Sequence, residues 1–216
     1  MLMRLLRGYE AYSILNYGID RNGNVLPVFL VSWGSGQNAL YTYILIPFIK
    51  LLGLSSFSVR LPTALIGCVS LFIFYKMLKI MFNKKTALIG VLFLSICPWN
   101  IMKSRWGLES NIFPDIILLA TFVLIYAIKS DKKKLIYLAF VIAGISAYAY
   151  STSYFFLPFF VIPVLIYLIA KKEINIKQAI ISLGIVFVIS LPIIIYVIIN
   201  TFDLSQINLP FMTYHY

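Results

Sequence analysis

The chain has 216 residues, of which 62% are apolar, 16% aromatic and only 12% charged, and its mean hydropathy is +0.95. Soluble domains are about half apolar and about a quarter charged, and a water-soluble fold could not bury this many apolar side chains. The composition excludes a soluble enzyme, a DNA-binding module and a disordered chain. It predicts an all-α, polytopic transmembrane helical protein.

The net charge of +11 comes from 18 Lys and Arg residues against 7 Asp and Glu residues. Most lysines fall in short loops between apolar runs, which is typical of the cytoplasmic loops of membrane proteins. Nucleic acid is therefore not expected as a partner. Cys68 and Cys97 lie within apolar runs, with no spacing typical of a metal site or a disulfide framework.

A helix needs roughly 17 to 25 apolar residues to cross the hydrocarbon core of a bilayer. Six stretches approach or reach that length and are expected to be spans of a transmembrane domain, 61–200. This domain would follow an outer-face loop, 1–60, and precede the start of a further outer loop, 201–216. The expected spans are 61–81, 86–103, 112–129, 134–151, 155–170 and 178–200.

Three lysine clusters, at 79–85, 129–134 and 171–177, indicate the orientation of these spans. The alternate loops, including 101–111 and 150–155, carry few lysines or none. Because cytoplasmic loops are enriched in Lys and Arg, the clusters are expected to be cytoplasmic and the alternate loops to lie on the outer face.

A seventh apolar stretch, 40–54, would break this alternation if it crossed the membrane. It is only about fifteen residues long, short for a span, and it contains Lys50. We therefore expect a juxtamembrane helix in the outer interface, with Tyr41 and Tyr43 at headgroup level. A short span with an atypical charge pattern is the alternative.

The polar segment 8–40 has neither an apolar stretch nor a signal peptide ahead of it, yet this orientation places it outside. We therefore expect the sequence to be a fragment of a longer protein, or a reading frame that starts late and ends early. Asn22-Gly23 in this segment is typical of a turn. Residues 33–38 are expected to form a flexible Gly-containing loop, which could approach a ligand closely or be a plain connection.

Further candidates lie near the outer ends of the spans. Arg60 could bind a phosphate through two parallel hydrogen bonds, or simply anchor its helix at the headgroups. Arg105 and Glu109 are four residues apart and would share a face if this stretch is helical. An acidic residue this close to the bilayer indicates function, although Glu109 could be only the salt partner of Arg105. Asp115 is expected to make a buried polar contact or to interact with its helix dipole.

The sequence contains no nucleophile and base pattern, metal-ligand spacing, phosphate-binding loop or dinucleotide fingerprint, and its one histidine is His215. What it does contain resembles the GT-C membrane glycosyltransferases of family 39 type, which include protein mannosyltransferases and aminoarabinose transferases. The resemblance covers essentially the whole chain. Its motifs are Gly8-Tyr-Glu-Ala-Tyr-Ser-Ile-Leu, Asp20-Arg-Asn-Gly-Asn, Ser58-Val-Arg-Leu-Pro and Ser104-Arg-Trp-Gly-Leu-Glu109.

The resemblance implies transfer of a sugar from a polyprenyl-phosphate carrier to an acceptor on the outer face of the membrane. The partners it implies are the polyprenyl-phosphate sugar donor and membrane lipid. The cofactor stays unknown, and a divalent metal is not evident from the sequence. Glu109 falls where the family has an acidic residue in its second outer loop, so it becomes the catalytic candidate. The substrate-binding candidates are Arg105, Arg60, Gln37 and Asn38.

Two departures from the family bear on activity. Residues 3–7 stand where relatives have an acidic pair, so the principal catalytic Asp is missing and this chain alone is expected to be inactive. Gln37-Asn38 replaces a Lys found in many relatives. The alternatives are a non-enzymatic subunit of cell-envelope polysaccharide assembly and, third, a small-solute transporter, against which the lack of an internal repeat argues.

Overall fold

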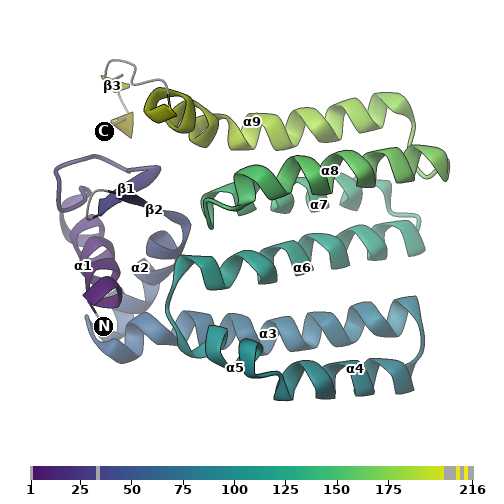
Figure 1. Cartoon of the computed structure of the whole chain (residues 1–216), viewed down its shortest axis with the longest axis horizontal. Helices are drawn as coiled ribbons and strands as arrows, with labels where there is room; N and C mark the ends of the chain where they lie inside the picture. The colour runs from purple at the N-terminus through teal and green to yellow at the C-terminus, as the bar shows by residue number, and fades with distance from the viewer. Residues whose placement is uncertain (1, 33–34, 202–207, 210–211, 214–216) are drawn as a thin grey trace.

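A computed structural model of the chain describes residues 2–32, 35–201, 208–209 and 212–213. Long helices lie side by side, and the N-terminal segment forms a cap across one end of them (Figure 1). The cap contains α1 (Leu2–Tyr17), an antiparallel hairpin of β1 (Phe29–Ser32) and β2 (Ser35–Asn38), and α2 (Leu40–Leu52). The helices that follow are α3 (Ser56–Met81), α4 (Lys84–Ile96), α5 (Pro98–Arg105), α6 (Glu109–Lys129), α7 (Lys133–Ile145), α8 (Ser153–Ala170) and α9 (Ile176–Thr201).

The expected count of six spans is not confirmed within the described residues. Four helices there are long and apolar enough to cross a membrane, namely α3, α6, α8 and α9. A fifth span results if α4 and α5 count as one, but a bend of 61° separates them. Pro98 at the start of α5 lacks an N–H and disfavours helical backbone in the residue before it, so α4 ends at Ile96.

In the expected span 134–151, the α-helix is shorter than the apolar run. Its helix α7 has 13 residues and passes into a 3₁₀ turn, η1 (Ser146–Tyr148). The Ser146 hydroxyl donates a 2.6 Å hydrogen bond to the carbonyl oxygen of Ala143. Such local side-chain bonds compete with regular helical hydrogen bonding, which accounts for the early end of α7.

The turns α3–α4, α6–α7 and α8–α9 all lie at one end of the bundle, and the cap lies at the other (Figure 1). The three lysine clusters therefore share the end away from the cap. Near the cap lie α5, the beginning of α6 and the connection between α7 and α8. The candidate residues of the first 60 positions and those of 98–111 thus come together at the same end.

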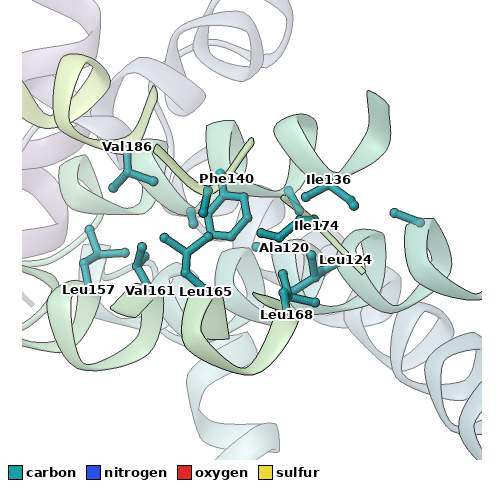
Figure 2. Packing of buried hydrophobic residues seen from close by; sticks show 14 of the residues in the cluster. Ala120, Leu124, Ile136, Phe140, Leu157, Val161, Leu165, Leu168, Ile174 and Val186 are labelled. Carbon is teal, nitrogen blue, oxygen red and sulfur yellow. The ribbon is translucent and has the colours of Figure 1, made fainter. Parts of the chain in front are cut away.

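Two apolar clusters hold this arrangement together. The larger joins α6, α7, α8 and α9 through side chains such as Leu124, Phe140 and Leu165 (Figure 2). The smaller joins the cap to the bundle and consists of Ala11, Tyr41, Leu45, Ile49, Val59, Ile112 and Ala149. Since its members come from α1, α2, α3, α6 and the α7–α8 connection, it fixes the surroundings of the candidate site.

The helix α2 occupies the place of the expected juxtamembrane helix, and its 13 residues are few for a span. Tyr41, Leu45 and Ile49 lie one helical turn apart and are buried against the bundle. At the end of the helix Lys50 is exposed and Leu51 is 82% exposed. A helix with one apolar face inward and further apolar side chains exposed suits a membrane interface.

The prediction of a flexible loop at 33–38 is corrected by the structure. Residues 33 and 34 lie outside the described residues, but 35–38 form β2, which pairs Gln37 with Leu30 of β1. A Cβ atom at Gly36 would lie 1.5 Å from the ring of Phe29, so a larger residue there would require that ring to move. Most of the expected outer loop 201–216, including His215, also lies outside the described residues.

Candidate functional site

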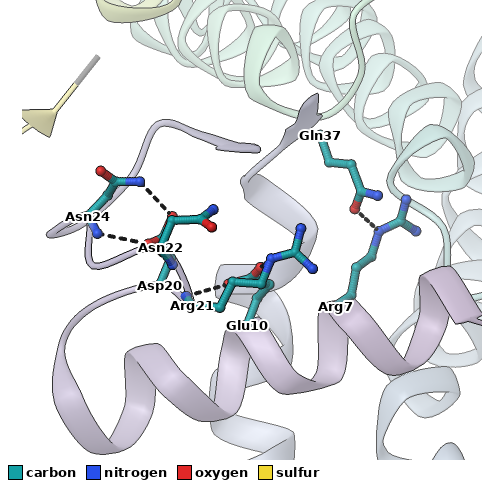
Figure 3. Close-up of polar contacts among 7 residues, drawn as sticks. All are labelled: Arg7, Glu10, Asp20, Arg21, Asn22, Asn24 and Gln37. Carbon is teal, nitrogen blue, oxygen red and sulfur yellow. Dashed lines mark hydrogen bonds and ion pairs between the residues drawn. The ribbon is translucent and has the colours of Figure 1, made fainter. Parts of the chain in front are cut away.

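Arg7 is the centre of a buried polar cluster, which we call the Arg7 cluster: Arg7, Gln37, Gly107 and Glu109. Arg7 is 3% exposed. Its Nε donates a 2.9 Å hydrogen bond to Gln37 Oε1, and its Nη1 donates a 3.0 Å bond to the carbonyl oxygen of Gly107 (Figure 3). Its Nη2 forms an ion pair with Glu109. One side chain thereby joins α1, β2, the 106–108 connection and α6.

All three nitrogens of the Arg7 guanidinium have partners, which offsets the cost of removing its charge from water. Burial lowers the pKa of Arg7 from its usual value, and the nearby Glu109 carboxylate opposes that shift. Removing either charge would leave the other buried without its partner. These contacts therefore hold the Arg7 guanidinium in one orientation between the cap and the start of α6.

The expected common helical face of Arg105 and Glu109 does not exist. The helix α5 ends at Arg105, α6 begins at Glu109, and the backbone between them is extended at Trp106 and Leu108. Glu109 pairs with Arg7 instead. Arg7 was not among the predicted site residues, because a hundred positions separate it from Gly107 and the contact depends on tertiary packing.

The connection 106–108 is held tightly. Asn111 Nδ2 donates hydrogen bonds to the carbonyl oxygens of Trp106, at 2.6 Å, and Lys103, at 3.0 Å. A Cβ atom at Gly107 would lie 2.7 Å from the carbonyl oxygen of Val59 and 2.9 Å from Tyr41 Oη. Only glycine fits without a shift of the backbone, so this connection lies directly against α3.

Tyr41 fixes the same stretch of α3 from another side. Its hydroxyl donates a 2.6 Å hydrogen bond to the carbonyl oxygen of Val59. Burial raises the pKa of Tyr41 to about 12, so the hydroxyl stays protonated and remains a donor at neutral pH. Val59 immediately precedes Arg60, and this bond therefore helps to place the candidate arginine.

Arg60 and Arg105 line one surface pocket between α3 and α5, with a volume of about 650 Å³. Both arginines are exposed, and neither forms an ion pair with the parts of the chain that the structure describes. We call this the Arg60–Arg105 pocket; its lining is Ser56, Phe57, Arg60, Leu61, Ala64, Ser104, Arg105 and Trp106. Two cations beside apolar and aromatic side chains can bind an anion that carries an apolar group.

Gln37 and Asn38 are both buried beside this region rather than in the pocket lining. Gln37 accepts the hydrogen bond from Arg7. Asn38 Nδ2 donates to the carbonyl oxygen of Ala147 at 3.1 Å, and Asn38 Oδ1 accepts from the hydroxyl of Tyr154 at 2.9 Å. Asn38 therefore ties β2 to the connection between α7 and α8.

Glu10 lies one turn along α1 from Arg7 and holds the segment after α1 (Figure 3). Its carboxylate forms an ion pair with Arg21 Nε at 2.9 Å and accepts a 3.1 Å hydrogen bond from the backbone N–H of Arg21. Burial raises the pKa of Glu10, while Arg21 opposes that shift. The turn expected at Asn22-Gly23 is present, with Gly23 at a φ of 86°.

Asp20 stabilises that turn from within. Its Oδ1 accepts hydrogen bonds from the backbone N–H groups of Asn22, at 2.9 Å, and Asn24, at 2.8 Å (Figure 3). A further buried ion pair joins Lys103 of α5 to Asp115 of α6. Across residues 2–32 and 35–201 and the two described strand fragments beyond, no three His, Cys, Asp or Glu side chains gather as a metal site would require.

Residues 37–199 match the family described as dolichyl-phosphate-mannose-protein mannosyltransferase. The putative mannosyltransferase YycA of Bacillus subtilis (strain 168) is 31% identical over 137 residues, which are 63% of this chain and 19% of YycA. The chain therefore spans about a fifth of the length of this curated relative.

Among solved structures, the fold is similar to ArnT from Cupriavidus metallidurans. The crystal structure of ArnT bound to undecaprenyl phosphate gives a TM-score of 0.67 at 11% identity and covers 94% of this chain and 38% of ArnT. The apo structure of ArnT gives 0.65 at 12% identity with the same coverage. At this identity the likeness establishes the fold. The family match, which covers most of the chain, shows that it belongs to the dolichyl-phosphate-mannose-protein mannosyltransferase family of GT-C membrane glycosyltransferases.

Proposed function

We propose that this chain is part of a membrane glycosyltransferase that takes a sugar from a polyprenyl-phosphate carrier and transfers it to an acceptor at the outer face of the membrane. In this proposal the cap, the end of α5 and the beginning of α6 face outward. The lysine clusters at 79–85, 129–134 and 171–177 support that orientation because they share the opposite end of the bundle, and cytoplasmic loops are enriched in lysine.

The observation that carries the proposal is the Arg60–Arg105 pocket. Its two exposed guanidinium groups suit a phosphate, which accepts parallel hydrogen bonds from arginine. Phe57, Leu61 and Ala64 in its lining suit the first units of an isoprenoid chain. ArnT, which shares the fold, was crystallised with undecaprenyl phosphate, a ligand of this chemistry. In the reaction, the same two cations would stabilise the phosphate as it leaves the sugar.

Within this proposal Glu109 is the acidic side chain that takes part in the reaction. Gln37 and Asn38 belong to the substrate-binding part of the site. Support for Glu109 comes from its position at the first residue of α6, three residues after Trp106 of the pocket. Because Glu109 is paired with Arg7, its role would be to orient groups or contact the sugar.

Binding of undecaprenyl phosphate to the chain in lipid nanodiscs tests the proposal. Arg60→Gln and Arg105→Gln are each expected to weaken binding about tenfold or more, because a charge-assisted contact contributes about 1.5–3 kcal/mol. Arg105→Lys should also weaken binding, since a point charge does not replace a planar fork of donors. Lys50→Gln removes one exposed cation from the same end of the molecule, outside the pocket, and is the matched control.

Equal affinity of the parent and both arginine variants would overturn the assignment of the pocket. No binding by the parent would count against a polyprenyl-phosphate substrate and favour a non-enzymatic subunit. Undecaprenol, which has the same isoprenoid chain without the phosphate, separates recognition of the anion from simple partition of an apolar chain.

A further inference from the structure

Gly107 is the point at which the two walls of the Arg60–Arg105 pocket touch. Arg105 and Trp106, which precede it in sequence, belong to one wall, and Arg60 follows Val59 in the other. The close approach of Gly107 to the carbonyl oxygen of Val59 leaves no room for a side chain. Any movement of Gly107 away from α3 would therefore change the separation of the two arginines.

Arg7 holds Gly107 in this place from the side of the cap. Its Nη1 binds the Gly107 carbonyl oxygen at 3.0 Å, while Gln37 and Glu109 hold the other two nitrogens of the same guanidinium. Because the guanidinium is planar and rigid, fixing two of its nitrogens also fixes the direction of the third. Arg7 itself is not part of the pocket lining.

We propose that Arg7 is a positioning residue for the phosphate site: it holds Gly107 against Val59 and thereby sets the separation of Arg60 and Arg105. This inference rests on the proposed function, in which those two arginines bind the phosphate of the lipid carrier. It assigns to α1 a role in substrate binding that requires no contact with the substrate.

The test uses the full chain with Trp33→Phe and Trp99→Phe, which leaves Trp106 as the only one of the three tryptophans. Two readouts are taken, the dissociation constant for undecaprenyl phosphate and the emission spectrum of Trp106. Arg7→Gln is expected to weaken binding about tenfold and to shift the Trp106 emission. Arg7→Lys should recover only part of the binding, because an ammonium cannot make the three directed contacts of a guanidinium.

Glu10→Gln is the matched control. It removes the other ion pair of α1, one turn away, without a contact to Gly107, so both readouts should stay at the parent values. An equal loss in Glu10→Gln and Arg7→Gln would overturn the inference, because it would reflect general disturbance of the cap.

Failure of the inference and failure of the proposed function give different results. If the parent does not bind undecaprenyl phosphate, the proposed function fails. If the parent binds and Arg7→Gln binds equally well, the function stands and the positioning role is wrong. If Arg7→Gln does not fold, Gly107→Ala tests the contact between Gly107 and Val59 with Arg7 intact. The added Cβ would lie 2.7 Å from the Val59 carbonyl oxygen. Weaker binding supports the inference, and unchanged binding overturns it.

Discussion

Lys103 of α5 and Asp115 of α6 form an ion pair in the interior of the bundle, where the side chains are 7% and 9% exposed. The Lys103 ammonium also lies 5.4 Å from the centre of the Trp99 ring. Although α5 is only eight residues long and bends away from α4, this pair ties it to the longer helix α6. It thereby holds the helix that carries Arg105.

Removing one member of this pair is expected to be far more harmful than removing both. Lys103→Met leaves the Asp115 carboxylate buried without its partner and should lower the free energy of unfolding by about 3–5 kcal/mol. Lys103→Met combined with Asp115→Leu should recover most of that loss. Thermal unfolding in detergent measures both, and equal destabilisation in the single and double variants would contradict the prediction.

Labelling of single cysteines tests the orientation of the bundle. In a background with Cys68→Ala and Cys97→Ala, cysteines at Asn22 and Ser110 are expected to react with a membrane-impermeant thiol reagent added to whole cells. Cysteines at Asn83 and Asp131, in the lysine-rich turns, should react only after the cells are opened. Reaction at Asn83 in intact cells would reverse the proposed orientation and restore 40–54 as a span.

Asn38 is expected to contribute to stability through its two side-chain hydrogen bonds. Asn38→Leu leaves the Ala147 carbonyl oxygen and the Tyr154 hydroxyl without that partner and should lower the free energy of unfolding by about 2–3 kcal/mol. Tyr154→Phe removes one of the bonds and should cost about 1 kcal/mol. Denaturant or thermal unfolding compares the stability of the two variants. A larger loss of stability in Tyr154→Phe would contradict the prediction that Asn38 contributes both bonds.

The stability contributed by Glu10 is expected to fall as the pH rises. In the unfolded chain its carboxyl ionises near the ordinary value of 4.5, whereas burial raises the pKa in the folded protein, despite Arg21. As the pH rises from about 4.5 toward the folded pKa, the unfolded state loses its proton first, which favours unfolding. Glu10→Gln cannot ionise, so the stability of the parent relative to this variant should decline over that range. A difference that rises with pH would contradict the raised pKa.

Much of the architecture follows from the sequence because a bilayer demands long apolar helices with satisfied backbones. Composition and apolar length indicated an all-α polytopic protein, and the structure confirms it. The short apolar stretch at 40–54 proved to be a short helix at the end of the bundle. The bend at Pro98 and the short α7 were missed, because a count of apolar residues does not show where helical hydrogen bonding stops.

The candidate site was predicted in part. Arg60 was expected to bind a phosphate or to anchor its helix, and Arg105 was a substrate-binding candidate. The structure places both side chains in the lining of one pocket. The pairing of Arg105 with Glu109 was wrong, because it assumed a continuous helix through Gly107. Local spacing describes neighbours along a helix and says nothing about a partner from another segment.

The sequence by itself determined that the chain enters a membrane, where its polar segments lie and which cations stand at its helix ends, because these depend on composition and on the length of apolar runs. Only the tertiary structure decided that Arg7 is the partner of Gln37, Gly107 and Glu109. Those contacts join residues 30 and 100 positions apart. The pairing of buried charges depends on how α1 packs against α2 and α3, and no periodicity along the chain records that packing.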